Sequence, residues 1–267
     1  MAEMIALERG GVLQAAPRLL QIIRVLARHK VLGAVLGKSH WPPPKAVRET
    51  IEELGLTFIK FGQVLAMRRD ILPDAYIDEL ALLHDQLPAM SIAAVRSTVE
   101  MALGTALTAL FSSFSETPLG SATIAQVHEA TMQDGRHVAV KVQRPDLKAM
   151  ISTDISALTY LVALAEGIFP RLRALDLPVV VREFAISLNR ETDFSREARS
   201  IVIFRTAMAD FPDLWIPNVV EECSRGAVLT LEFSAGERVD FFARQHPEAM
   251  PHSMNTCLLY TSDAADE

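Results

Sequence analysis

After Pro118 the chain changes from helical to strand periodicity. Residues 121–130, SATIAQVHEA, and residues 136–142, RHVAVKV, are short and β-prone, and the turn-forming pair Asp134-Gly135 stands between them. This arrangement predicts an antiparallel hairpin in the middle of the chain. A hairpin is marginally stable alone, so it must pack against other elements.

Helical patterns precede and follow this hairpin, and two strand-like runs come at 215–220 and 227–233. Apolar residues at helical spacing predict helices over 12–37, 45–72, 74–85, 91–110, 145–169 and 178–208. Helices, a hairpin, more helices and two strands indicate the α+β fold class, with a helical extension at the N-terminus.

Composition excludes several classes of protein. Half of the 267 residues are hydrophobic and 22% are charged, as in chains that fold into a globular core. The net charge of −7 argues against nucleic acid as a partner, because phosphates require a basic face. Two cysteines, Cys223 and Cys257, are too few for a disulfide framework and stand in no zinc-ligand spacing. No uncharged run reaches the roughly 20 residues of a membrane-spanning helix, so we expect none.

The charge is unevenly placed, because residues 1–48 carry +6 and leave −13 for the rest. Basic residues lie among the apolar ones of the helix expected over 12–37, namely Arg18, Arg24, Arg28 and Lys30. A basic amphipathic helix indicates contact with an anionic membrane surface or a partner groove. It is equally typical of a helix that packs on its own domain with a solvated basic face. Residues 1–40 form this segment.

The second strand of the hairpin reads Val138-Ala139-Val140-Lys141, as in the small lobe of a protein kinase. There the lysine reaches the nucleotide phosphates, a small residue leaves room for adenine, and a helix glutamate holds the lysine. Ordinary kinases carry a GxGxxG loop before this strand, whereas Gly120 stands alone here. An ordinary protein kinase is therefore disfavoured, and VAVK by itself also fits a solvated strand lysine.

Four ordered segments resemble the UbiB (AarF) family of atypical kinase-like proteins. They are Lys60-Phe61-Gly62-Gln63 for the KxGQ motif, Gly120 to Thr123 for the alanine-rich loop, Lys141 for the nucleotide lysine, and Glu191-Thr192-Asp193 with Glu197-Ala198 for the ExD segment. Flanking runs such as LAMRRDILPD and VKVQRPDL are also similar to this family. The resemblance spans about residues 45–242.

The resemblance implies a protein-kinase-like small lobe that binds ATP. The catalytic residues that it implies are Lys60, Gln63, Glu191 and Asp193. The nucleotide-binding residues that it implies are Gly120, Ser121, Ala122, Thr123, Ala139, Lys141, Glu197 and Glu232. Glu232 lies in the run 229–236, LTLEFSAG, which resembles a kinase hinge but also fits an ordinary strand that ends at Gly236.

Two acidic residues of the last long helix need separate partners. Glu191 and Glu197 are six positions apart, which on one continuous helix places their carboxylates about 240° apart. The family pattern implies that Glu197 supports Lys141 and that Glu191 or Asp193 meets Lys60. The alternative is that nearby arginines pair with these acids on an exposed helix, namely Arg190, Arg196 and Arg199.

The KxGQ element suggests a mechanism. By resemblance, its helix covers the place where a protein kinase receives its peptide, which favours ATP hydrolysis or phosphorylation of a small molecule. Lys60 and Gln63, three positions apart, share one face of that helix. His128, in a strand, is expected to be a packed or capping residue without a catalytic role.

The sequence also indicates an incomplete protein. Neither an HRD-like nor a DFG segment occurs in 236–256, so the catalytic Asp and the Mg²⁺ ligands are expected beyond the end of this chain. Residues 257–267, CLLYTSDAADE, read as a translated sequencing adapter, although a short natural tail is the alternative. The expected segments are a KxGQ extension over 45–115, a kinase-like lobe over 116–235, and the start of a mostly missing large lobe.

By resemblance, the parent protein is a UbiB-type atypical kinase or ATPase that supports ubiquinone biosynthesis. The implied location is cytoplasmic and peripheral to the inner membrane. Implied partners are ATP, a polyprenyl lipid or the enzymes of quinone biosynthesis, and the membrane surface. The alternatives are a pseudokinase scaffold that binds nucleotide or lipid without turnover, and a lipid-binding protein that retains the lobe.

Overall fold

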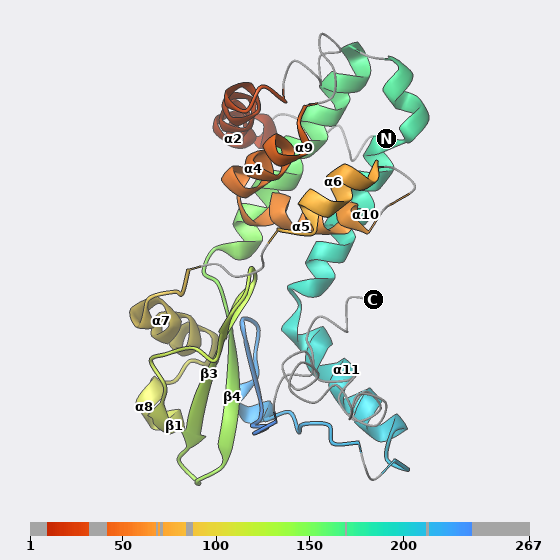
Figure 1. The fold of residues 1–267 in the computed structure, drawn as a ribbon. Helices are drawn as coiled ribbons and strands as arrows, with labels where there is room; N and C mark the ends of the chain where they lie inside the picture. The colour runs from red at the N-terminus through yellow and green to blue at the C-terminus, as the bar shows by residue number, and fades with distance from the viewer. Residues whose placement is uncertain are drawn as a thin grey trace. The chain divides into compact units, whose positions relative to one another are not determined.

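The computed structural model describes residues 10–31, 42–67, 69, 72–83, 88–168, 170–211 and 214–236. These residues form two compact units, both visible in Figure 1. Unit 1 is built from residues within 1–88, 121–124 and 145–192, and unit 2 from residues within 89–120, 125–144 and 193–267. The expected large-lobe start after Gly236 and the adapter-like tail lie outside the described residues.

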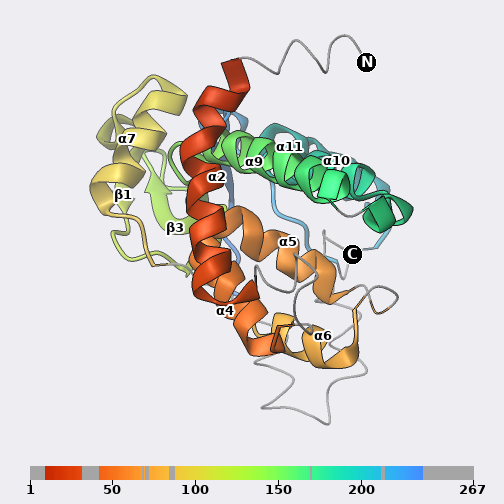
Figure 2. The ribbon, with the colours of Figure 1, turned by 90° about the horizontal axis from the view of Figure 1, so that it is seen from above.

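Unit 1 is helical. Its helices are α2 (Gly10–Arg28), α4 (Pro44–Leu54), α5 (Leu56–Ala66), α6 (Asp74–Leu80), α9 (Leu147–Ile168) and α10 (Leu177–Glu191), with a 3₁₀ turn over Pro170–Leu175. Helix α2 packs along α9 and also contacts α4 (Figure 2). Its core contains Ile22, Val25, Ile51, Leu54, Phe58, Ile59, Leu80, Leu83 and Ala157.

The helix expected over 12–37 ends earlier than its hydrophobic pattern predicts. Helix α2 ends at Arg28, and Lys30 adopts a left-handed conformation with φ 59°. A non-glycine residue at positive φ interrupts the helix whatever the hydrophobic pattern around it. Residues 32–37, where the expected helix would end, lie outside the described residues.

The helix expected over 45–72 is two helices. Gly55 separates α4 from α5 at φ 90°, a conformation that glycine adopts without steric cost. Its N–H lies 3.2 Å from the carbonyl oxygens of both Ile51 and Glu52, so it closes the last turn of α4. The hydrophobic spacing continues across this break, which is why periodicity alone predicted a single helix.

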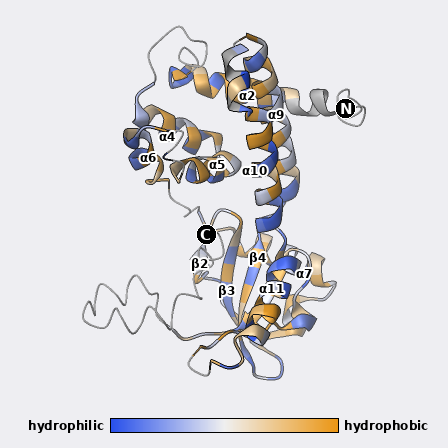
Figure 3. Cartoon of the chain, turned by 90° about the vertical axis from the view of Figure 1, so that its right-hand side faces the viewer, coloured by the Kyte–Doolittle hydropathy of each residue, from blue (hydrophilic) through white to orange (hydrophobic). Residues whose placement is uncertain are grey.

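Among the described helices, only α9 has the length and mean hydropathy that would allow it to cross a membrane. Length and composition alone give this result, and a core helix meets the same criteria. Four of its residues are buried within the protein, namely Leu147, Ile151, Asp154 and Ala157. Figure 3 shows polar residues interspersed with apolar ones along the helix. The Asp154 carboxylate pairs with Arg18 of α2, which favours packing inside unit 1.

Unit 2 contains the antiparallel sheet. The strands of the sheet are β1 (Phe111–Phe114), β2 (Gly120–Ser121), β3 (Ala125–Met132), β4 (His137–Gln143) and β5 (Val228–Glu232), in the order β1-β3-β4-β5, with β2 beside β3. Residue Ser121 of β2 is grouped with unit 1. The helices of this unit are α7 (Ile92–Leu103), α8 (Leu107–Leu110) and α11 (Phe194–Ala207), with a 3₁₀ turn over Glu221–Cys223. The α+β class and the small antiparallel sheet are confirmed.

The central hairpin is confirmed with its turn. Strands β3 and β4 pair antiparallel, with Val127 opposite Lys141, and Gly135 in the turn has φ 90°. Side chains alternate across a strand. Val138, Val140 and Val142 therefore face the core that α7 covers with Val95 and Val99, while Ala139 and Lys141 occupy the opposite face.

Two predictions about neighbouring elements are wrong. The helix expected over 91–110 stops at Leu103, because Gly104 has φ 70°, and the chain continues through short α8 into β1. Strand β1, with the sequence FSSF, was not predicted because four residues carry too weak a pattern. The run 215–220 forms no named strand; within it, Val219 makes an isolated bridge to Leu231.

The two units cut across the segments expected from the sequence. Helices α9 and α10 were assigned to the kinase-like lobe, and they belong to unit 1. Helices α7 and α8 and strand β1 were assigned to the extension, and they belong to unit 2. Hydrophobic contacts made by residues far apart in the chain decide this division, and periodicity does not reveal them.

Candidate functional site

Lys141 and Glu197 form an ion pair in unit 2. The Lys141 Nζ lies 2.9 Å from each carboxylate oxygen of Glu197, which projects from the first turn of α11. The two side chains are 22% and 32% exposed. The strand lysine therefore meets a helix glutamate, as the family pattern implies. A charged pair with two hydrogen bonds fixes the ammonium more firmly than a single contact does.

The helix expected over 178–208 is broken directly before this glutamate. Helix α10 ends at Glu191, and Asp193 caps α11 by accepting the backbone N–H groups of Ser195 at 3.1 Å and Arg196 at 3.2 Å. The calculated angle of about 240° assumed one continuous helix, and that assumption is wrong. Glu191 and Glu197 still have separate partners, because they lie on different helices.

Asp193 is placed as a helix cap. N-capping carboxylates satisfy backbone donors that have no partner within the helix. The cap sets where α11 starts, and hence where Glu197 stands relative to β4. Arg199 approaches the other Asp193 oxygen at 3.9 Å, so one part of the exposed-arginine alternative is also present.

Lys60 and Glu191 form the corresponding pair in unit 1. The Lys60 Nζ lies 2.7 Å from Glu191 Oε1, and the side chains are 15% and 24% exposed. This contact joins α5 to the end of α10. Beside it, the rings of Phe61 and Phe184 pack edge to face with centroids 5.0 Å apart. Of the two acids that the family pattern offered, Glu191 is the partner of Lys60.

The other two KxGQ positions are packing positions. The Gln63 amide donates to the Leu83 carbonyl oxygen at 3.4 Å. A Cβ atom added at Gly62 would lie 2.5 Å from Leu83 Cδ1 and 3.2 Å from Ile51 Cδ1. Glycine is therefore required because α4 and the Leu83 segment pack directly against α5. Sequence reasoning did not find this role, since a glycine inside a helical pattern carries no information about its neighbours.

The alanine-rich loop begins in an open position. Gly120 and Ser121 form β2, Ala122 is exposed and Thr123 is buried. A Cβ atom at Gly120 would meet no atom within 4 Å, and its φ is not in the left-handed region. The fold itself thus does not require glycine there. Glycine at this open position permits a close approach to the backbone.

The segment before this loop is anchored to β3. The Leu119 N–H donates to Val127, and the buried His128 Nδ1 lies 2.9 Å from the Ser115 carbonyl oxygen. The His128 ring stacks on Phe114 with centroids 5.2 Å apart. Burial lowers the pKa of His128, so the neutral ring donates through Nδ1. The prediction of a packed histidine is confirmed.

In the hinge-like run over 229–236, some backbone N–H groups already donate hydrogen bonds within the protein. The Glu232 N–H donates to the Asn218 carbonyl oxygen at 2.9 Å, and the Phe233 N–H donates to His137 at 3.1 Å. The Glu232 carboxylate accepts the Asn218 amide at 2.8 Å. Of the groups expected to bond adenine, the N–H donors of Glu232 and Phe233 are thus already used. Ala139 lies two residues before Lys141, on the same face of β4.

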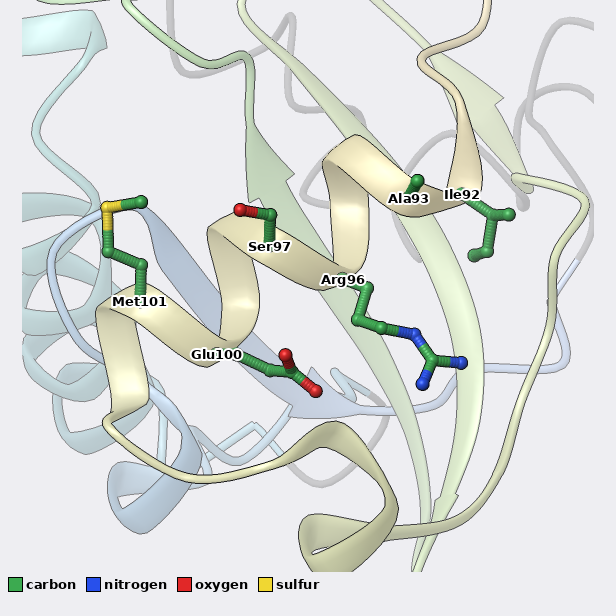
Figure 4. A pocket seen from close by; sticks show the side chains of 6 residues that line it. All are labelled: Ile92, Ala93, Arg96, Ser97, Glu100 and Met101. Atoms are coloured by element: carbon green, nitrogen blue, oxygen red, sulfur yellow. The ribbon is translucent and has the colours of Figure 1, made fainter.

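One hollow of unit 2 lies elsewhere, on α7. It has a volume of about 510 Å³ and lies on the outer face of α7, where Figure 4 shows its lining. All six lining residues come from that helix: Ile92, Ala93, Arg96, Ser97, Glu100 and Met101. The Glu100 carboxylate already accepts the Leu107 N–H at 3.0 Å, and Met101 is 80% exposed. This open helix face does not include Lys141.

The described residues do not fit a magnesium site by themselves. Within the described ranges, no group of three or more histidine, cysteine, aspartate or glutamate side chains gathers in one place. Mg²⁺ prefers several oxygen ligands in octahedral geometry, often with substrate phosphates among them. Glu191 in unit 1 and Glu197 in unit 2 are each paired with a lysine, and Asp193 caps α11.

Comparison with known proteins agrees with this arrangement. Residues 82–259 match the ABC1 atypical kinase-like domain. Proteins named probable protein kinase UbiB from Xylella fastidiosa strains 9a5c and M23 are each 38% identical over 188 residues. The match covers 70% of this chain and 34% of those proteins, so the chain spans about a third of their length.

Among solved structures, the Mycobacterium tuberculosis protein Rv3197 in complex with erythromycin is 30% identical, with a TM-score of 0.49. That likeness covers 68% of this chain and 46% of the other. The match to the ABC1 domain extends over more than half of the chain and includes Lys141, Glu191 and Glu197. The chain therefore belongs to the UbiB/AarF family of atypical kinase-like proteins.

Proposed function

We propose that this chain is the nucleotide-binding part of a UbiB-type atypical kinase or ATPase that acts in ubiquinone biosynthesis. The observation that carries the proposal is the ion pair in which both Glu197 oxygens hold the Lys141 ammonium. In kinase-like folds, a strand lysine held in this way binds the nucleotide phosphates. The Xylella fastidiosa relatives are named probable protein kinase UbiB, and the similarity of this chain to them supports the same assignment.

ATP is the proposed ligand. Lys141 would hold its phosphates, and the open position at Gly120 would let the loop backbone approach them. Ala139, half-buried on the Lys141 face of β4, would border the adenine. Because the Glu232 and Phe233 N–H groups are taken, adenine contacts at the hinge-like run would use its carbonyl oxygens or the residues from Ser234 onward.

The catalytic roles of four further residues belong to this proposal. The Lys60–Glu191 pair neutralises two charges and holds α5 on α10, while Gln63 bonds the backbone at Leu83. Asp193 sets the start of α11. We assign to Lys60, Gln63 and Glu191 the shaping of unit 1 and to Asp193 the shaping of unit 2, with any contact to ATP or a small acceptor molecule made in the full-length protein.

Replacing Lys141 tests the proposal. Lys141→Ala is expected to weaken binding of a fluorescent ATP analogue with Mg²⁺ by about 30-fold or more, because it removes the phosphate-binding cation and leaves Glu197 unpaired. Titration of the full chain by fluorescence anisotropy measures the dissociation constant. Lys148→Ala, which removes an exposed lysine of α9, is the matched control and should bind as the unmodified chain does. Equal affinity for the Lys141→Ala variant would reject the proposal.

Measuring ATP turnover distinguishes a kinase or ATPase from a pseudokinase scaffold. The full-length protein should release phosphate from ATP and lose that activity with Lys141→Ala if it is a kinase or ATPase. Nucleotide binding without any turnover would favour the pseudokinase scaffold. The chain described here serves for the binding measurement alone, because it spans about a third of the length of its relatives.

Location at a membrane surface is the second part of the proposal, and the contacts of α2 change how it is argued. Ile22 and Val25 of α2 are buried in the core of unit 1, whereas Leu20 is 53% exposed. Arg18 pairs with Asp154, and Arg28 pairs with Glu53. Two of the four basic residues of this segment are therefore paired within the protein, and we propose a peripheral electrostatic contact instead of helix insertion.

Two exposed cations remain for that contact. Arg24 and Lys30 make no ion pair within the part of the chain that the structure describes, and both are exposed. Arg24→Glu with Lys30→Glu should reduce binding to vesicles containing anionic phosphatidylglycerol by about tenfold or more, since each basic residue near such a surface contributes about 1 kcal/mol. Co-sedimentation measures this, and zwitterionic vesicles are the control. Unchanged binding to the anionic vesicles would remove α2 from the proposed contact.

A further inference from the structure

Phe194 occupies an unusual place for a buried aromatic residue. It is the first residue of α11, directly after the cap Asp193, and only 1% of its surface is exposed. Among the described residues of unit 2, the hydrophobic core beneath α7 does not include it. A fully buried ring outside that core must have another environment.

That environment contains the Lys141 ammonium. The Nζ atom lies over the Phe194 ring, 4.9 Å from its centroid, and 2.9 Å from each Glu197 oxygen. Residues three apart share one face of a helix, so α11 presents the ring and the carboxylate together. The face of an aromatic ring carries negative charge density and attracts a cation. Two different groups of one helix turn therefore hold the same lysine.

We propose that Phe194 is a positioning residue for Lys141, and that its π face orients the ammonium for a nucleotide phosphate. This inference rests on the proposed nucleotide function. An ammonium has three N–H donors, and Glu197 accepts hydrogen bonds on both of its oxygens. The ring attracts the charge without acting as a strong hydrogen-bond acceptor. A lysine already held in place loses less freedom when a phosphate oxygen arrives, and this strengthens binding.

Graded fluorination of the ring provides the test. Phenylalanine at position 194 is replaced in the full chain by its 4-fluoro, 3,5-difluoro and 3,4,5-trifluoro analogues, which withdraw electron density from the face with little change in shape. Affinity for a fluorescent ATP analogue with Mg²⁺ should fall stepwise, to about fivefold weaker for the trifluoro ring. Phe194→Leu, which keeps an apolar side chain without a π face, should show at least as large a loss.

The matched control is the same fluorinated series at Phe114. This ring lies in the same unit and stacks on His128, away from Lys141. Its fluorination should leave the affinity unchanged. Equal affinity across the Phe194 series would overturn the proposal, even if Phe194→Leu bound poorly, because the ring would then be only an apolar filler. Tighter binding with increasing fluorination would also overturn it.

A readout without nucleotide separates this inference from the proposed function. The ring current of Phe194 should shift the Lys141 Hε NMR resonances upfield, and Phe194→Leu should return them to the range of exposed lysines. If ATP does not bind to the unmodified chain but this shift is present, the nucleotide function fails while the lysine–ring contact holds. If the shift is absent from the unmodified chain, the positioning role itself fails.

Discussion

Arg18→Ala is expected to lower the free energy of unfolding of unit 1 by about 3–5 kcal/mol. The Arg18 guanidinium pairs through Nε with Asp154 of α9, and its Nη2 donates to the Leu54 carbonyl oxygen at 2.6 Å. It also lies 5.6 Å from the centroid of the Phe58 ring. One side chain thus links α2 to α9, α4 and α5.

The size of this effect comes from the carboxylate that would remain. Asp154 is 2% exposed, and its Oδ2 atom already has no hydrogen-bond partner in the described part of the chain. Removing the guanidinium leaves a buried negative charge without compensation, which is far more costly than losing a surface ion pair. The carbonyl oxygen of Leu54, at the end of α4, would also lose its side-chain donor.

Chemical denaturation followed by circular dichroism measures the prediction. Arg24→Ala, an exposed arginine of the same helix, is the matched control and should change stability by less than about 0.5 kcal/mol. Combining Arg18→Met with Asp154→Leu should recover much of the loss, because an apolar pair avoids the buried charge. Equal stability of the Arg18→Ala and Arg24→Ala variants would show that the pair contributes nothing.

Gly62→Val is expected to destabilise unit 1 by about 3 kcal/mol. The added Cβ would lie 2.5 Å from Leu83 Cδ1, and Ile51 at 3.2 Å and 3.3 Å restricts the movement that could relieve the contact. Overpacking a close helix contact costs about 1–3 kcal/mol, and a β-branched side chain adds to it. The effect is on folding, although the residue belongs to the KxGQ motif.

Gly167→Val provides a helix-matched control for this change. Gly167 lies in α9, has no positive φ, and an added Cβ would meet no atom within 4 Å. Its substitution should change stability by about 1 kcal/mol or less. Thermal unfolding of both variants measures the difference. If the two variants unfold at the same temperature, the close approach at Gly62 does not restrict the sequence.

These two residues also affect how loss of function is interpreted. A Gly62 variant that loses activity would not by itself assign chemistry to the KxGQ motif, because the unit that carries Lys60 would be destabilised. Charge reversal at Arg18 would likewise unfold unit 1 instead of testing membrane contact. Arg24 on α2 and Lys30 just after it are the residues that test the membrane contact without this effect.

The charged pairs of the candidate site could be predicted, because they depend on residue types and on the order of the motifs along the chain. Lys141 in a β-prone run, a turn at Asp134-Gly135 and the downstream acids Glu191 and Glu197 indicated two lysine–glutamate pairs. Both pairs are present in the structure, at 2.9 Å and 2.7 Å. Alternation along β4 also placed Lys141 away from the valine core, since period two is a local property.

Other parts could not be predicted from local patterns. Phe194 was not singled out, because only the approach of β4 to α11 puts a ring beside Lys141. The break at Thr192–Asp193 was missed because helical spacing continues through it, whereas Asp193 satisfies the first N–H groups of a new helix. The pairing of Arg18 with Asp154 could not be predicted for a similar reason, since the two residues are 136 positions apart.

The sequence by itself determined the small antiparallel sheet, the family and the residues of both charged pairs. These follow from periodicity, turn chemistry and the order of motifs, which depend on neighbours along the chain. Only the tertiary structure decided at which position a glycine is required, which arginine pairs with a buried carboxylate and which aromatic ring contacts the lysine. Close packing and burial of charge depend on atoms brought together from distant positions, and no local pattern contains that information.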